Sequence, residues 1–222
     1  MLERRFGFPV TISNDVVCSM LAERFFGHGD KSMLFIKIDR GIGAATLIEM
    51  WTVIGQNHAG GEIGHISLDP ESGVLCPCGK RGCLETMVTS PVIRERIRRA
   101  STPEEQLDII RSCGEQLAAA LAMPIGLLDI NDICVYGPPD IVNAAFLEAT
   151  QRRVDMVSSS KFHKHTSVRR CQVGSDIALR GSAIDVVHHS HRERSLREPP
   201  KALRYESRPL PVQGAALDSC SA

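Results

Sequence analysis

The feature of this sequence that most constrains its fold is a cluster of three cysteines in the segment Cys76-Pro77-Cys78-Gly79-Lys80-Arg81-Gly82-Cys83. The two glycines allow so short a backbone to turn back on itself, so that the three sulfur atoms can face one centre. His65 is the nearest upstream histidine and would complete a tetrahedral set of ligands. We therefore expect His65, Cys76, Cys78 and Cys83 to bind a structural zinc ion that fastens a glycine-rich loop.

Two other interpretations of this cluster are open. The cysteines could be unconnected free thiols in a surface loop, or two of them could form a redox pair. The flanking glycines favour the metal, and Cys-x-Cys differs from the usual Cys-x-x-Cys arrangement of redox motifs. The other cysteines are scattered, mostly among apolar neighbours, and are expected to remain thiols: Cys18, Cys113, Cys134, Cys171 and Cys220.

Composition and charge indicate an ordinary soluble protein. Hydrophobic residues make up 43% of the 222 residues and charged ones 23%. The 26 Lys and Arg residues equal the 26 Asp and Glu residues, so the chain has no overall electrostatic attraction to nucleic acid or membrane. The longest apolar runs fall short of the roughly 20 residues of a bilayer span, and the N-terminus lacks a signal-peptide core. A cytoplasmic location is expected.

Strands alternate with helices along the chain, which predicts an α/β fold. The expected strands cover residues 8–13, 33–38, 44–50, 132–137 and 169–173, and the expected helices cover 16–26, 91–99, 103–123, 140–154 and 177–187. Residues 55–85 are rich in glycine and are expected to form a functional loop region. We interpret residues 1–187 as one folded domain. Residues 188–222 lack an apolar period and are predicted to be a disordered tail.

The same motifs resemble the signature of the ROK family, a group of bacterial sugar kinases and sugar-responsive repressors. Gly61-Glu62-Ile63-Gly64-His65 resembles the family's Gly-Glu-x-Gly-His element, and Cys76 to Glu85 matches its Cys-x-Cys-Gly-x-x-Gly-Cys-x-Glu element. Asn14-Asp15 matches the Asn-Asp pair of the kinases, and Gly41-Ile42-Gly43 resembles their second phosphate loop. The resemblance implies an α/β, actin/hexokinase-like (ribonuclease H-like) lobe that lacks most of the first lobe and carries the zinc-stapled loop.

By this resemblance, the hydroxyl groups of a hexose or hexosamine would be held by Asn14, Asp15, Glu62, His65 and Glu85. Carboxylates accept hydrogen bonds from hydroxyls, and a zinc-bound imidazole has a fixed tautomer whose free N–H is a donor. Zinc would orient the site without doing chemistry. In a kinase, Asp15 would be the catalytic base, while Gly41 and Gly43 would contact the phosphates of ATP with Mg²⁺. Alternatively, the Asn-Asp pair only caps a helix.

Three departures from the kinase pattern favour a regulator. The sequence contains neither the Asp-x-Gly-Gly-Thr loop of the kinases nor the winged helix of the repressors. Arg40 stands where the kinases place Thr, and Met50 and Trp51 replace a glycine turn. We therefore expect the sugar-sensing part of a ROK transcriptional regulator, homo-oligomeric and without enzyme activity, that reaches DNA only through an N-terminal domain absent from this chain. The alternatives are a truncated ATP-dependent sugar kinase of glucokinase or fructokinase type, and a degenerate zinc-binding remnant.

Overall fold

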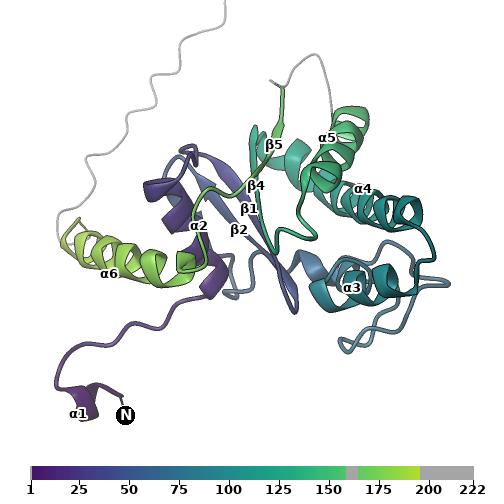
Figure 1. Cartoon of the computed structure of the whole chain (residues 1–222). Coiled ribbons are helices and arrows are strands. Elements are labelled where there is room, and N and C mark those ends of the chain that lie inside the picture. The colour runs from purple at the N-terminus through teal and green to yellow at the C-terminus, as the bar shows by residue number, and fades with distance from the viewer. Residues whose placement is uncertain (1, 159–164, 196–222) are drawn as a thin grey trace, which may run out of the picture. The chain divides into compact units, whose positions relative to one another are not determined.

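A five-stranded mixed sheet forms the centre of the computed structural model, which describes residues 2–158 and 165–195 (Figure 1). The strand order is β3-β2-β1-β4-β5. The strands are β1 (Met33–Ile38), β2 (Ile42–Ile48), β3 (Trp51–Val53), β4 (Asp132–Tyr136) and β5 (Ser167–Arg170). Strands β1, β2 and β3 pair antiparallel, whereas β1, β4 and β5 pair parallel. The predicted α/β fold is confirmed.

Helices cover both faces of this sheet (Figure 1). The helices of the described residues are α1 (Leu2–Phe6), α2 (Asp15–Phe26), α3 (Ser90–Arg99), α4 (Pro103–Leu128), α5 (Ala144–Ser158) and α6 (Ile177–Ser195), with two 3-10 turns, η1 (Ile63–His65) and η2 (Leu84–Thr86). Helices α2 and α6 lie on one side of the sheet, and α3, α4 and α5 lie on the other. Of the helices in the described part of the chain, none is long and apolar enough to cross a membrane.

Strand β1 shows how the sequence builds two cores at once. Successive side chains of a strand point to opposite faces, and five of the six residues of β1 are buried. Leu34 and Ile36 join the larger cluster with α3, α4 and α5, whereas Met33 and Phe35 join a second cluster with α2. The one exception is Lys37, whose side chain is 17% exposed. A lysine in so apolar a strand needs a partner for its charge.

A buried ion-pair network ties α2 to the parallel edge of the sheet. The side chain of Glu23 is fully buried and accepts a hydrogen bond of 2.6 Å from Arg169. Arg169 also binds both carboxylate oxygens of Asp132, at 2.7 and 3.0 Å. The backbone N–H groups of Gln172 and Val173 donate to Glu23 as well. The position of α2 is therefore set by polar groups as well as by apolar packing.

The structure contradicts the predicted strand at residues 8–13, which form no regular structure between α1 and α2. Within the described residues, no strand is paired with this segment. Because a strand is held by hydrogen bonds to a neighbour, β-branched residues alone cannot form one.

A third antiparallel strand, β3, was not predicted. It follows a two-residue turn in which Glu49 and Met50 both adopt positive φ, at 46° and 70°. This is the backbone of a type I′ hairpin, which glycine and asparagine normally provide. Ser32 supports the turn, since its Oγ accepts a hydrogen bond from the Glu49 N–H. From the sequence we expected Met50 and Trp51 to replace the glycine turn of the kinases. The residues of this turn do differ, but the turn itself remains a tight, two-residue one.

Several predicted helix ends differ from the structure. Helix α4 continues through Pro124 to Leu128, because the buried Leu121 and Ile125 keep its face packed on the core. Helix α5 begins four residues later than predicted, where the Asn143 side chain accepts a hydrogen bond from the Phe146 N–H.

The last helix, α6, begins at Ile177 as predicted and runs on to Ser195. It packs closely on α2, since a Cβ on Gly181 would overlap the carbonyl oxygen of Cys18. Of the predicted tail, residues 188–195 belong to this helix, and residues 196–222 lie outside the described part.

Candidate functional site

The four predicted metal ligands converge. The ligand atoms of His65, Cys76, Cys78 and Cys83 all lie within 4.8 Å of one another. His65 Nδ1 lies 3.7 Å from Cys76 Sγ, and Cys78 Sγ lies 3.6 Å from Cys83 Sγ. A tetrahedral zinc ion with bonds of roughly 2.3 Å to sulfur keeps its sulfur ligands about 3.8 Å apart. The spacing of these residues fits such an ion.

The cysteine segment reaches this arrangement through a tight hairpin. Gly79 and Gly82 have φ values of 91° and 63°, a backbone region that favours glycine. Two backbone hydrogen bonds close the hairpin: the Gly79 N–H donates to Cys76 O, and the Cys76 N–H donates to Lys80 O. The three sulfur atoms therefore meet because the two glycines allow the turn, as the sequence analysis expected.

The thiols of this cluster differ in acidity. A backbone hydrogen bond from Lys80 lowers the pKa of Cys78 to about 7. Burial raises the pKa of Cys83 to about 11. A divalent cation bound between them would favour the thiolate form of all the sulfur ligands, because its charge outweighs these local effects.

The histidine loop is fastened to both the cysteine hairpin and the sheet. Lys80 Nζ donates a 2.6 Å hydrogen bond to the carbonyl oxygen of His65. On the other side, the Ala44 N–H donates to Gly61 O at 2.8 Å, which joins the loop to β2. Because His65 turns Nδ1 toward the sulfur atoms, Nε2 is left on the opposite edge of the ring. If Nδ1 held a metal ion, the ring would present Nε2 to a ligand.

The carboxylate of Glu85 lies between two glycines from different segments. A Cβ built on Gly41 would stand 3.4 Å from Glu85 Oε2, and one on Gly64 would stand 3.2 Å from it. The structure thus brings Glu85 to the glycine turn before β2 and to the residue next to His65. Glu62, in contrast, is exposed at the start of η1.

Asn14 and Asp15 lie at the start of α2 and have different tasks. The Oδ1 atom of Asn14 accepts hydrogen bonds from the N–H groups of Val16 and Val17, at 2.8 and 3.3 Å. Asn14 therefore caps the helix and keeps its amide N–H groups for other partners. Asp15 is 65% exposed and forms an ion pair with Lys37, in which Nζ lies 2.5 Å from Oδ2.

The first turn of α2 also reaches the start of β2. A Cβ on Gly43 would stand 3.2 Å from a methyl carbon of Val16. Glu85 thus approaches Gly41, and helix α2 approaches Gly43. Sequence analysis did not identify Lys37, although a lysine inside an apolar strand was a visible signal.

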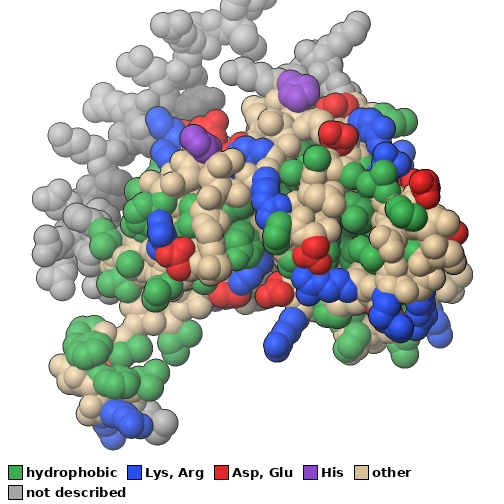
Figure 2. Space-filling model, viewed as in Figure 1, with side chains coloured by type: hydrophobic (Ala, Val, Ile, Leu, Met, Phe, Trp, Pro, Cys, Tyr) green, Lys and Arg blue, Asp and Glu red, His purple; other side chains and the backbone are tan. Residues whose placement is uncertain are grey.

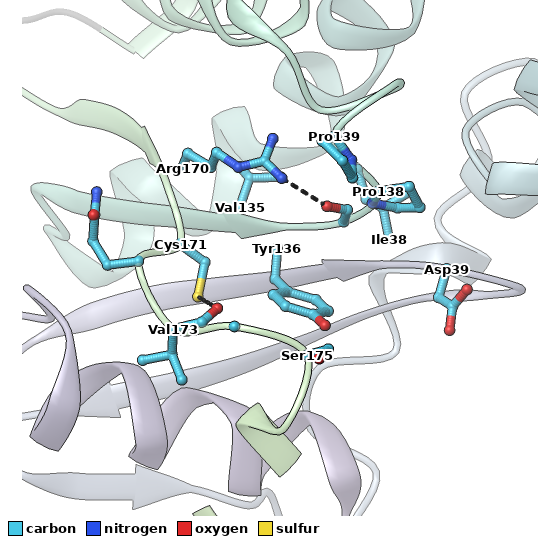
Figure 3. A pocket seen from close by; sticks show the side chains of 13 residues that line it. Ile38, Asp39, Val135, Tyr136, Pro138, Pro139, Arg170, Cys171, Val173 and Ser175 are labelled. Carbon is cyan, nitrogen blue, oxygen red and sulfur yellow. Dashed lines mark hydrogen bonds between the residues drawn. The ribbon is translucent and has the colours of Figure 1, made fainter. Parts of the chain in front are cut away.

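A separate pocket of about 420 Å³ lies at the carboxyl ends of β1, β4 and β5 (Figure 3). Among the residues that line it are Asp39, Tyr136, Arg170 and Ser175. Arg170 donates hydrogen bonds to the carbonyl oxygens of Gly137 and Val142. Ligands of α/β sheets bind at such carboxyl ends. The sequence analysis missed this pocket, although Gly137-Pro138-Pro139 marked a turn at the end of a strand.

Comparison with known proteins identifies the group to which this chain is related. The ROK family profile matches residues 1–188. The chain belongs to the ROK family. The transcriptional dual regulator NagC of Escherichia coli K12 is 25% identical over 82% of this chain and 51% of its own length. A glucokinase of Halalkalibacterium halodurans is 41% identical, over 40% of this chain and 28% of its own length.

Solved ROK structures share the fold. A ROK transcriptional regulator described as a homologue of the E. coli MLC protein superposes with a TM-score of 0.72 at 24% identity, over 82% of this chain and 53% of its own. A ROK hexokinase from Thermus thermophilus gives 0.71 at 25% identity, over 86% and 69%. The predicted actin/hexokinase-like lobe is confirmed by these neighbours. The chain spans about half the length of two curated relatives that it matches over most of its own length.

Proposed function

We propose that this chain is the sugar-sensing part of a ROK transcriptional regulator, in which a structural zinc ion orients the sugar site. The observation that carries the proposal is the position of Glu85. Its carboxylate lies beside Gly64 and the glycine turn, next to the residue that would ligate zinc. A carboxylate at this point can accept a hydrogen bond from a sugar hydroxyl. Because its neighbours Gly41 and Gly64 have no side chains, neither of them obstructs the carboxylate.

Zinc is the metal that the ligand set favours. Three sulfur atoms and one imidazole nitrogen are typical of a closed structural zinc site. Such an ion would fix the His65 ring and leave Nε2 as a reliable partner for a second hydroxyl. Asn14, Asp15 and Glu62 would complete a site for a hexose or hexosamine.

One observation favours a regulator over a kinase. Arg40 is exposed beside Gly41, where its bulk replaces the small hydroxyl residue expected of a kinase phosphate loop. In a regulator, sugar binding would shift the equilibrium between two conformations and so change the affinity of a DNA-binding domain.

The surface supports an indirect route to DNA. Figure 2 shows acidic and basic side chains scattered among uncharged ones on the visible face. Several arginines pair with acids on the surface, among them Arg94 with Asp140 and Arg99 with Glu95. Since such mixed charge is a poor match for phosphates, DNA would be bound by another domain of a cytoplasmic homo-oligomer.

The decisive experiment measures sugar binding by saturation-transfer NMR, which detects millimolar affinities. The protein is prepared with zinc and offered glucose, N-acetylglucosamine and xylose, the sugars suggested by relatives' names. We expect one of these to bind and Glu85→Gln to abolish the signal. Glu71→Gln, an exposed acid in the same loop region, is the matched control and should bind normally.

A truncated sugar kinase is the second candidate. The observation in its favour is the pocket of about 420 Å³ at the carboxyl ends of the strands, which Asp39 lines. A kinase would form sugar phosphate from ATP and Mg²⁺, and Asp15→Asn would stop it. We expect no sugar phosphate above background. Product formation would establish the kinase, whereas zinc binding without any sugar signal would leave only the degenerate zinc-binding remnant.

A further inference from the structure

The ion pair between Lys37 and Asp15 points to a role for a lysine in the middle of the sheet. Lys37 is the one residue of β1 that is not fully buried. Its ammonium group lies 2.5 Å from Asp15 Oδ2. Placing a charge in a strand this apolar costs free energy, so the position of Lys37 calls for an explanation beyond packing.

The backbone explains how Lys37 reaches Asp15. Lys37 pairs in register with Gly43 on β2 and with Tyr136 on β4. Its side chain points to the α2 face, as do those of Met33 and Phe35 at every second position. Gly43 lacks a side chain, so the first turn of α2 can approach β2 and bring Asp15 over the end of β1.

The two charged groups remain open to a ligand. The Asp15 side chain is 65% exposed, and its ion pair with Lys37 uses Oδ2, so that among the described residues Oδ1 remains available to accept a hydrogen bond. A lysine ammonium has three N–H donors, of which one binds Asp15. A sugar hydroxyl is both a donor and an acceptor. One hydroxyl can therefore donate to Asp15 Oδ1 and accept from Lys37 Nζ, which uses its one donor and one of its two acceptor sites.

We propose that Lys37 is a sugar-contacting residue that also holds the Asp15 carboxylate in position. This inference rests on the proposed sugar-binding function and adds a residue to that site. In this arrangement, Asp15 acts as a fixed acceptor for a hydroxyl.

The test compares sugar affinity in a set of matched variants of the zinc-loaded protein. Lys37→Met keeps the apolar stem and removes the charge, Lys37→Arg keeps the charge, and Asp15→Asn keeps the shape of the acid. Lys31→Met, which alters an exposed lysine outside the site, is the control. Affinity for glucose, N-acetylglucosamine and xylose is measured by saturation-transfer NMR titration, and folding by thermal unfolding.

We expect Lys37→Met and Asp15→Asn each to weaken binding of the recognised sugar by about tenfold or more, as loss of a hydrogen bond to a charged group does. The double variant should be little weaker than either single variant, because the two residues act as a unit. Lys37→Arg should retain part of the affinity, and Lys31→Met all of it. If Lys37→Met does not fold, Asp15→Asn and Lys37→Arg carry the same comparison.

The outcomes separate this inference from the proposed function. If Glu85→Gln abolishes binding while Lys37→Met and Asp15→Asn bind as the parent does, the sugar site stands and the role of Lys37 is wrong. Strictly additive losses in the double variant would also contradict it, because they would mean that the pair does not act together. If the parent protein binds none of the three sugars, both proposals fall.

Discussion

Gly61 lies directly against the backbone of Ala44, and a Cβ on Gly61 would overlap the Ala44 carbonyl oxygen. Gly61 also adopts a φ of 97°, which side chains rarely tolerate. This contact joins the histidine loop to β2. We expect Gly61→Ala to destabilise the fold by about 2 kcal/mol or more, since it combines strain with overlap. Thermal and urea unfolding would measure the change.

Gly126 offers the matched control for that prediction. It lies in α4, and a Cβ at this position would meet nothing within 4 Å. Gly126→Ala should therefore stabilise the protein by roughly 0.5–1 kcal/mol, because alanine has the higher helix propensity. Equal effects of the two substitutions would show that the Gly61–Ala44 contact does not constrain the loop.

The metal site predicts a spectroscopic signature. Replacement by Co²⁺ should give the visible absorption of a tetrahedral site with thiolate ligands, and mass spectrometry should find one zinc ion per chain. Cys83→Ser should lose the ion and lower the unfolding temperature. Cys220→Ser, a cysteine outside the described residues, should change neither. A chain that is purified from zinc-containing medium without zinc would refute the site.

The buried network around Glu23 should be sensitive to loss of its cation. Arg169→Met leaves the fully buried Glu23 carboxylate without its arginine, and we expect a loss of about 3–5 kcal/mol. Arg152→Met, an exposed arginine on α5, should change stability little. Urea unfolding would compare the two variants, and a similar small change in both would argue that backbone donors alone satisfy Glu23.

The same residue predicts a pH dependence. Burial raises the pKa of Glu23, but hydrogen bonds from Cys171 and Arg169 outweigh it and hold the pKa below 4.5. A group with a lowered folded pKa stabilises the protein above its unfolded pKa, and that stability is lost as pH falls through the folded pKa. The unfolding free energy should thus fall as pH drops below about 5.

Glu23→Gln tests this assignment, because it removes the titrating group and should flatten that part of the profile. Glu148→Gln, an exposed glutamate on α5, should leave the profile unchanged. Unfolding midpoints measured from about pH 7 to pH 3 would decide between them. A profile that Glu23→Gln does not alter would place the acid sensitivity elsewhere.

Local features were predictable from the sequence. The cysteine segment spans only a few residues and contains its own glycines, so its turn depends on nothing distant. The strand at 33–38 and the helix from Pro103 carried patterns strong enough to predict their type. Helix α4 nevertheless outran its predicted end, because packing of Leu121 and Ile125 outweighs the local effect of Pro124.

The sequence by itself thus determined the α/β class, the family resemblance and the four side chains that converge at the cysteine hairpin, because each depends on residue type and short spacing. Tertiary structure alone decided the relationships between distant residues. Lys37 meets Asp15 across 22 positions, and Arg169 meets Glu23 across 146. Residues 8–13 have strand-forming composition yet form no strand, because a strand requires a neighbour. Such pairings follow from sheet register and helix packing, which no local pattern specifies.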